Sequence, residues 1–226
     1  MPEWTNGDPA NAPRRGALAR GGSLAPARLL AAYRAGIFPW CLSGQSLEWW
    51  CPDPRFVMTP ADFRLTESLR KTLRKKGWEV TCDQNFETVM RSCAAVQREG
   101  QTSTWITEPM IAAYTELNRL GIAHSIEVRW EGELVGGLYG IAIGRLFHGE
   151  SMFHTRTDAS KVAFADLVQR LSTSGYVLID CQLSTPHLAS LGAFHISRDD
   201  FLAIVHRERD LVPRGDAWTN PFSAGS

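Results

Sequence analysis

Long hydrophobic runs are missing from this chain. No apolar stretch reaches the roughly 18 to 20 residues that a membrane-spanning helix needs, although 44% of the 226 residues are hydrophobic. The segment from Met1 to Arg20 is rich in Pro, Gly, Asn and Arg and lacks the apolar stretch of a secretory signal. We therefore expect no membrane association, a cytoplasmic location and a sizeable apolar core.

Clustered cysteines are missing too. The five cysteines are scattered and form no C-x-x-C pair, which favours reduced thiols in a cytosolic protein. A structural zinc site needs Cys and His at short spacings, and the sequence has no such cluster. His148 and His154 could face each other, but two ordinary imidazoles are the simpler interpretation. We expect neither a metal nor a cofactor.

An excess of charge of either sign is also missing. Lys and Arg total 24, as do Asp and Glu, so a uniformly basic surface is excluded and only a local patch could bind nucleic acid. The segment Leu65–Lys76 predicts a helix with Leu65, Leu69 and Leu73 on one side. Four cations lie opposite at paired i, i+4 spacings, namely Arg70, Lys71, Arg74 and Lys75. A solvated helix face is the ordinary interpretation, but this concentration in a neutral chain favours contact with a nucleic-acid backbone.

Turn-forming residues divide the chain near Arg55. The stretch from Ile37 to Arg55 is aromatic, and Pro39, Pro52 and Pro54 indicate irregular structure there. We expect a small N-terminal domain at residues 1–55, with a helix from Ser23 to Ala35, and a main domain at residues 56–226.

The sequence of the main domain predicts helices, then an antiparallel meander, a further helix and a strand. Glu131-Gly132 predicts a tight turn between strands His124–Trp130 and Glu133–Ile143. The other expected elements are strands at Trp78–Cys82, Arg145–Phe153 and Tyr176–Asp180, and helices at Phe86–Val96, Thr107–Gly121, Asp158–Ser174 and Ser184–Gly192. This α+β order is that of the N-acetyltransferase (GNAT) fold, with a largely antiparallel sheet flanked by helices. Another antiparallel α+β sandwich is the alternative.

Seven short segments, in unbroken order, resemble those of leucyl/phenylalanyl-tRNA–protein transferases. They are Gly36-Ile-Phe-Pro-Trp40, Trp49-Trp50-Cys-Pro-Asp-Pro-Arg55, Thr104-Trp-Ile-Thr107, His124-Ser-Ile-Glu-Val128, Gly149-Glu-Ser-Met-Phe153, Asp180-Cys-Gln182 and Ala189-Ser-Leu-Gly-Ala193. The resemblance implies a GNAT-like domain that takes Leu, Phe or Met from aminoacyl-tRNA. The acceptor implied is the α-amine of proteins with N-terminal Lys or Arg, which are thereby marked for N-degron proteolysis.

The segment after the last strand of the meander argues against coenzyme A. Acetyltransferases hold the pyrophosphate of CoA with a glycine-rich loop and the next helix N-terminus. Here the equivalent link from His154 to Asp158 has no glycine, and Asp158 would place a negative charge beside the phosphate. We expect the donor to be aminoacyl-tRNA and not CoA.

Asp180 and Gln182 end an apolar strand and are separated by one residue. Strand periodicity places both side chains on one face, with Cys181 on the other. By the resemblance, Asp180 accepts a proton from, or orients, the attacking amine, and Gln182 orients the aminoacyl carbonyl. The structural alternative is that Asp180 caps the following helix. Whether the protein or the hydroxyls of the tRNA transfer the proton stays open.

Glu150 is a carboxylate within an apolar strand, in phase with Leu146, His148 and Met152. An acceptor that begins with Lys or Arg needs an anionic contact, and Glu150 is the candidate alongside Asp180. The alternative is a buried ion pair with Arg145 or Arg156.

The resemblance also implies an apolar aminoacyl pocket and an aromatic surface. The pocket residues implied are Leu138, Phe147, Met152, Phe164, Leu167 and Leu171, of which the last three form a helical stripe that is usually core on spacing alone. Trp40, Trp105 and Tyr114 would form a shelf for the terminal adenosine, because base–aromatic stacking tolerates any base. The basic helix would then contact the tRNA backbone.

Three other functions compete with this interpretation. A tRNA-dependent ligase on a related fold usually duplicates the domain, for which this chain is too short. A CoA-dependent acetyltransferase lacks its glycine loop here. A non-catalytic tRNA-binding module would need the basic helix and the aromatic shelf but not Asp180, Gln182 and Glu150 together.

Overall fold

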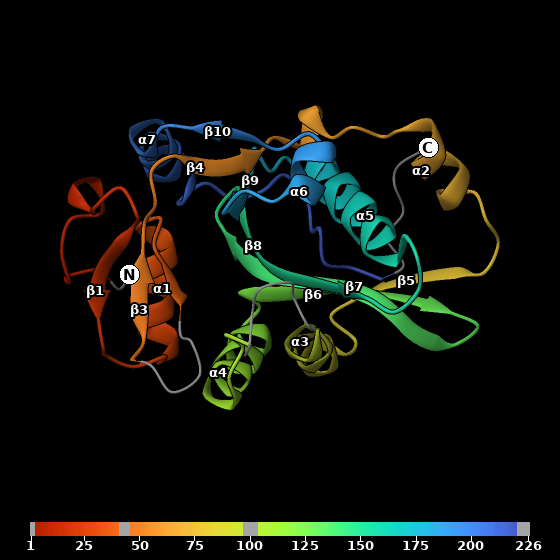
Figure 1. The fold of residues 1–226 in the computed structure, drawn as a ribbon, viewed down its shortest axis with the longest axis horizontal. Helices are drawn as coiled ribbons and strands as arrows, with labels where there is room; N and C mark the ends of the chain where they lie inside the picture. Colours follow the sequence, from red (N-terminus) through yellow and green to blue (C-terminus); the bar gives the residue numbers. More distant parts are fainter. Residues whose placement is uncertain (1–2, 41–45, 97–103, 221–226) are drawn as a thin grey trace.

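The computed structural model describes residues 3–40, 46–96 and 104–220. These residues form a three-stranded sheet near the N-terminus and a seven-stranded sheet with helices on both faces (Figure 1). The predicted α+β class, with a mostly antiparallel sheet flanked by helices, is confirmed.

The N-terminal part is more regular than predicted. Strands β1 (Ala17–Arg20), β3 (Glu48–Trp50) and β2 (Phe38–Trp40) form an antiparallel sheet in that order. Pro39 does not break β2, because β2 is an edge strand and can leave one N–H position empty. Helix α1 (Pro26–Arg34) begins at its proline, with extended Ala25 before it, so the predicted start at Ser23 is wrong.

The seven-stranded sheet has the order β10-β4-β9-β8-β7-β6-β5. Its strands are β4 (Arg55–Met58), β5 (Trp78–Cys82), β6 (Ala123–Trp130), β7 (Glu133–Ile143), β8 (Leu146–His154), β9 (Leu178–Gln182) and β10 (Phe194–Ile196). Every pairing is antiparallel except that of β8 with β9. The predicted turn joins β6 to β7, and both of its residues have positive φ, +52° at Glu131 and +81° at Gly132. A two-residue hairpin of this kind is confirmed.

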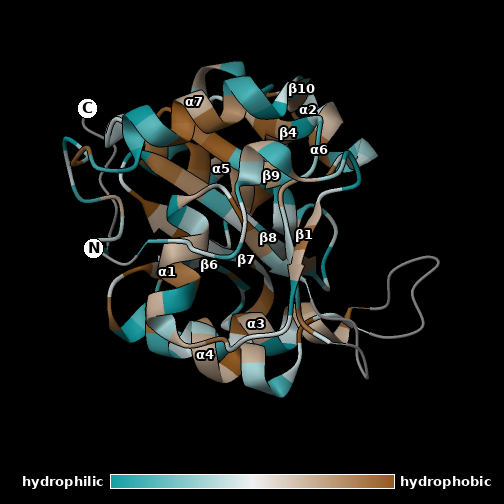
Figure 2. Cartoon of the chain, turned by 90° about the vertical axis from the view of Figure 1, so that its left-hand side faces the viewer, coloured by the Kyte–Doolittle hydropathy of each residue, from teal (hydrophilic) through white to brown (hydrophobic). Residues whose placement is uncertain are grey.

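Helices on the two faces of the sheet build two apolar cores. One core lies against α1, α3 (Phe86–Ala95), α4 (Glu108–Arg119) and α7 (Arg198–Glu208), and the other lies under α5 (Ala159–Thr173). Two shorter helices, α2 (Glu67–Leu73) and α6 (Pro186–Ser190), flank α5 in Figure 1. In Figure 2 the hydrophobic colours appear both on strands and on the helices that cover them. Strand β10 and helix α7 are not among the predicted elements.

The predicted domain boundary near residue 55 stays a prediction. Strand β4 of the large sheet begins at Arg55, so the two sheets divide the chain at this point. One apolar core nevertheless joins both parts, since Leu29 and Trp49 belong to the same cluster as Tyr139 and Phe201. No helix in the described part of the chain is long and apolar enough to cross a membrane.

Candidate active site

The main cleft opens where β8 and β9 diverge. These parallel strands pair only over Leu146–His148 and Leu178–Asp180, and beyond these residues they separate. A cavity of about 450 Å³ follows, lined by Gly149–Met152 from β8 and by residues 181–185 from the end of β9. Helix α5 and the Trp40 and Trp105 side chains complete its walls. The divergence of two parallel strands therefore creates the site.

A β-bulge directs Glu150 into this cleft. Tyr139 pairs with Ser151 and Gly140 with Gly149, so Glu150 is an extra residue in β8. A Cβ at position 140 would meet the carbonyl oxygen of His148 at 2.3 Å, which explains a glycine opposite the bulge. The bulge also reverses the alternation of side chains along β8. The predicted phase, with Met152 on the face of Leu146, is therefore wrong.

Asp180 is fully engaged by cationic and backbone donors. Its side chain is 1% exposed. Arg55 donates through Nε to Oδ1 at 2.7 Å and through Nη2 to Oδ2 at 2.6 Å. His148 Nδ1 lies 2.8 Å from Oδ2, and the amide N–H of Gln182 donates to Oδ1 at 3.0 Å. Burial alone would raise the pKa of Asp180, but Arg55 and His148 hold that pKa well below its usual range.

The alternative that Asp180 caps the next helix is wrong. Helix α6 is capped by Thr185, whose hydroxyl accepts from the amide of Leu188 at 3.2 Å. The guanidinium of Arg55 is itself fixed from both sides, since it lies over the rings of Phe38 and Phe201 at 4.9 and 4.3 Å. Asp180 thus belongs to a rigid ion pair.

His148 completes the hydrogen bonding of Asp180. A carboxylate can only accept, so Nδ1 of His148 carries the proton that lies against Asp180. The other ring nitrogen, Nε2, is buried and has no hydrogen-bond partner among the described residues. The imidazole packs against the ring of Tyr33 at 5.3 Å.

Glu150 is held by neutral donors. Tyr33 donates its hydroxyl to Oε1 at 2.7 Å, and Gln182 Nε2 donates to the same oxygen at 2.7 Å. The hydroxyl of Tyr114 lies 3.5 Å from Oε2 and also contacts the Tyr33 hydroxyl. Burial raises the pKa of Glu150 to about 7, although these hydrogen bonds oppose the rise. Glu150 therefore titrates near neutral pH.

The alternative, a buried ion pair of Glu150 with Arg145 or Arg156, is wrong. Arg145 pairs with Glu208 instead, and Arg156 stacks on Trp130. Gln182 connects the two carboxylates, because its amide N–H binds Asp180 and its side chain binds Glu150. Its backbone has a φ of +60°, which turns the chain away from β9 at the cavity.

Comparison with known proteins identifies the family. The family model of the leucyl/phenylalanyl-tRNA protein transferase matches residues 57–206, and that of its N-terminal domain matches residues 22–53. The chain belongs to the leucyl/phenylalanyl-tRNA–protein transferase family. A relative from Syntrophobacter fumaroxidans is 51% identical over 95% of this chain and 92% of its own length. One from Pseudomonas aeruginosa is 54% identical over 89% of this chain and 88% of its own length.

A solved structure is more remotely similar. A GCN5-related N-acetyltransferase from Kribbella flavida is 15% identical, and the match covers 64% of this chain and 55% of that chain with a TM-score of 0.40.

All but one of the predicted pocket residues line the cavity. Those that line the cavity are Leu138, Phe147, Met152, Phe164 and Leu167. Leu171 does not line it, because its side chain is 0% exposed and lies in the core beneath α5. Leu171 lies one helical turn beyond Leu167, where α5 no longer borders the cavity. The prediction that Leu171 lines the pocket is therefore wrong.

Two of the three predicted shelf residues lie together. Trp40 and Trp105 line the cavity with their rings 6.3 Å apart, and Trp50 lies 5.7 Å from Trp40. Tyr114 is 0% exposed and its hydroxyl contacts the buried Glu150 carboxylate, so a place for it on the shelf is wrong. A tyrosine on an apolar helix face shows the same spacing whether its hydroxyl points to a ligand or to a buried carboxylate.

Arg55, Tyr33 and His148 belong to the site but are missing from the predicted set. The signal for Arg55 is a cation at the head of the apolar strand Arg55–Met58, all of which is buried. A buried guanidinium needs a carboxylate partner, and Asp180 is the partner here. Tyr33 gives no local signal, because its contact with Glu150 spans 117 positions of sequence.

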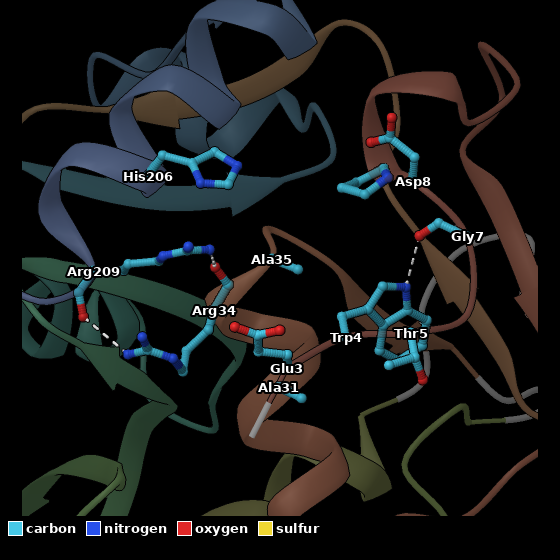
Figure 3. Close-up of a pocket in the computed structure, with 11 residues that line it drawn as sticks. Glu3, Trp4, Thr5, Gly7, Asp8, Ala31, Arg34, Ala35, His206 and Arg209 are labelled. Atoms are coloured by element: carbon cyan, nitrogen blue, oxygen red, sulfur yellow. Dashed lines mark hydrogen bonds between the residues drawn. The ribbon is translucent and has the colours of Figure 1, made fainter. Parts of the chain in front are cut away.

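A larger cavity lies away from this site. About 720 Å³ in volume, it lies between residues 3–9, α1 and α7 (Figure 3). Its arginines are already paired: Arg34 donates to the carbonyl of Arg209 at 3.3 Å, and Arg209 returns a bond to the carbonyl of Arg34 at 2.8 Å. Arg34 also binds Asp210 at 2.6 Å. No predicted site residue lines this cavity.

The basic helix is shorter than expected but exposed. Helix α2 begins at Glu67 and ends at Leu73, with Thr66 as its cap. All four predicted cations, Arg70, Lys71, Arg74 and Lys75, are exposed. Among the described residues, no group of three or more His, Cys, Asp or Glu side chains could hold a metal.

Proposed function

We propose that this chain transfers a leucyl or phenylalanyl group from tRNA to the α-amine of proteins that begin with Lys or Arg. Its membership of the transferase family supports this reaction. The observation that carries the proposal is a cavity with an apolar wall, an aromatic shelf and Glu150 as its one lining carboxylate among the described residues. The reaction would mark the acceptor for proteolysis in the cytoplasm.

The reaction is aminolysis of an activated ester. The neutral amine attacks the aminoacyl carbonyl, an amide bond forms, and the ester bond to the ribose breaks with a proton passing to the ribose oxygen. Holding both substrates in attack geometry can account for about 7 to 11 kcal/mol at the upper limit. A general base adds roughly 10²–10⁴-fold.

Glu150 is our candidate for that base. A general base works best when its pKa is near the working pH. Burial raises the pKa of Glu150 to about 7. A free α-amine has a pKa of about 7.7 to 8.0, so a fair fraction is neutral near pH 7 and can attack, and the base takes the proton that the attacking nitrogen then loses. The earlier assignment of Glu150 to the basic side chain of the acceptor stays a prediction.

Asp180 is better suited to positioning than to proton transfer. Its oxygens already accept four hydrogen bonds, and it does not line the cavity. Through Gln182 it fixes the amide that holds Glu150. Gln182 does line the cavity, so we retain it as the residue that orients the aminoacyl carbonyl.

The apolar wall fits Leu, Phe and Met. Leu138, Met152 and Phe164 present no polar atom that a hydrophobic amino acid would leave unsatisfied. One methylene is worth only about 1–3 kcal/mol in such a pocket, so preference among these three donors should be modest. Trp40 and Trp105 would stack on the terminal adenosine.

The segment from His154 to Asp158 is poorly suited to binding the pyrophosphate of coenzyme A. Asp158 bonds to Lys161 at 2.9 Å and to Thr72 at 3.3 Å, so its carboxylate is fixed beside the start of α5. The Lys161 hydrogen bond lowers the pKa of Asp158, which keeps the negative charge in place. Acetyl-CoA should therefore show no specific binding by calorimetry, and micromolar affinity would contradict this view.

The deciding experiment uses charged tRNA and matched peptides. The protein is incubated with leucyl-tRNA and peptides that differ only in a first residue of Lys, Arg, Ala or Glu. We expect product with Lys and Arg only, and none with uncharged tRNA. Tight tRNA binding without any transfer would instead identify a binding module.

A further inference from the structure

Arg156 is held against two tryptophans at the end of β8. Its guanidinium lies 4.1 Å from the ring centre of Trp130 and 5.9 Å from that of Trp78. The two indoles pair across β5 and β6 and meet nearly edge to face, 4.7 Å apart at 72°. Stacking on Trp130 restricts the side chain without using its N–H groups.

A cavity of about 380 Å³ lies beside this stack. Lys75, both tryptophans and residues 155–158 line it. Arg156 forms no ion pair within residues 3–40, 46–96 and 104–220, and its side chain is exposed. Asp158 is the lining carboxylate, it pairs with Lys161 at 2.9 Å, and the two cations Arg156 and Lys75 outnumber its single negative charge. Arg156 and Lys75 therefore leave the cavity with positive charge and free donors.

The position of the cavity connects two parts of the proposed RNA path. Lys75 lies just beyond α2, so the cavity continues the exposed face of Arg70 and Arg74. Thr155 directly follows β8, which carries Glu150 and Met152 in the active-site cavity. An RNA that reaches from the basic helix to the aromatic shelf can pass this point.

We propose that Arg156 and Lys75 bind a backbone phosphate of the donor tRNA, outside its terminal adenosine. A guanidinium presents parallel N–H groups that match a phosphate, and the tryptophans hold them in place before binding. The site rests on the proposed function, because it needs tRNA as the donor. Glu131 and Glu133 are exposed at the tip of the β6–β7 hairpin, and their negative charges disfavour RNA there. The RNA would therefore run toward α2.

The test compares two donors that differ in their RNA. Aminoacyl-tRNA can reach Arg156, whereas an aminoacyl-adenosine ends at the shelf. Arg156→Gln should weaken tRNA binding about fivefold at moderate salt and lower the slope of log Kd against log salt by about one, as for one lost phosphate contact. Transfer from aminoacyl-adenosine should not change. Arg156→Lys should recover part of the tRNA affinity, because the charge stays and the fork is lost.

Arg119→Gln is the matched control. It removes one charge from an exposed arginine, 73% exposed at the end of α4, which packs on the opposite face from α5. Equal tRNA affinities and salt slopes in the two Gln variants would overturn the proposal, as would an equal loss of transfer from both donors in Arg156→Gln. Failure of the wild-type protein to transfer from either donor would instead contradict the proposed function.

Discussion

Asp180 and Glu150 lie on neighbouring strands, and both are buried and bound to Gln182, yet their surroundings differ in charge. Asp180 faces the guanidinium of Arg55 and the imidazole of His148. Glu150 faces the hydroxyls of Tyr33 and Tyr114 and the amide of Gln182. The pKa of Asp180 is held well below its usual range, whereas burial raises that of Glu150 to about 7.

The difference separates structure from chemistry within one network. A carboxylate that is paired with a cation at every oxygen stays ionised and fixes its neighbours, but it cannot take a proton near neutral pH. A carboxylate held by neutral donors keeps its hydrogen bonds and can still exchange a proton. Only Glu150 also lines the substrate cavity, so we assign proton transfer to it and positioning to Asp180.

The largest expected effect follows removal of the cation from the Asp180 cluster. Arg55→Met leaves a buried carboxylate without its main partner, which should cost about 3–5 kcal/mol of unfolding free energy. The double variant Arg55→Met/Asp180→Leu should recover much of that loss, because both charges of the ion pair are then removed. Urea titrations of both variants measure the difference. Equal losses in the two variants would mean that the ion pair is not what stabilises the cluster.

Glu150 should show the opposite behaviour on substitution. Its folded pKa lies above the unfolded value of about 4.3, so the folded state binds the extra proton and stability falls as pH rises toward 7. Glu150→Gln removes this pH-dependent loss of stability, because glutamine does not titrate. The stability of the variant relative to wild type should therefore rise by about 3 kcal/mol between pH 4 and pH 8. Thermal and urea melts at both pH values test this, and a pH-independent difference would contradict the raised pKa.

Donor preference should change at Phe164 but not at Leu171. Phe164 lines the cavity and Leu171 is buried behind it, although both lie on α5. Phe164→Ala should change the relative transfer rates for Leu, Phe and Met by about 1–3 kcal/mol. Leu171→Ala should lower stability and leave the ranking unchanged. Rates that move in proportion for all three donors in Phe164→Ala would exclude this side chain from the pocket wall.

The smallest effect concerns Tyr33, which donates a hydrogen bond to Glu150. Tyr33→Phe removes a hydrogen-bond donor to the carboxylate, at a cost of about 0.5–1.5 kcal/mol. The donor favours the ionised form, so the pKa of Glu150 should rise and the acidic limb of the rate profile should shift to higher pH. A shift to lower pH would contradict the hydrogen-bond assignment.

Local patterns predicted the elements that depend on neighbouring residues. The turn at Glu131-Gly132 and the strand Trp78–Cys82 follow from turn residues and alternation within a few positions. The three-stranded sheet was not predicted, because short strands around prolines are stabilised by pairing across the chain. The bulge at Glu150 also carries no local signal, since it depends on the register of β7.

The candidate site divides in the same way. Asp180, Gln182 and Glu150 stand out as polar residues in apolar strands, and the structure brings all three together. Their roles depend on partners far away in sequence, such as Arg55, 125 positions from Asp180. Helical spacing does not indicate where the cavity ends, so it could not show that Tyr114 and Leu171 are fully buried.

The pH dependence of transfer tests the division between the two carboxylates most directly. The rate is measured at limiting concentrations of a Lys-starting peptide for wild type, Glu150→Gln and Asp180→Asn. Wild type should need both the amine and Glu150 deprotonated, so log rate should rise with a slope near two below about pH 6.5. Glu150→Gln should show a slope of one, while Asp180→Asn keeps the steeper slope at a lower rate. A slope of one in wild type, or loss of the steeper slope only in Asp180→Asn, would contradict the assignment of proton transfer to Glu150.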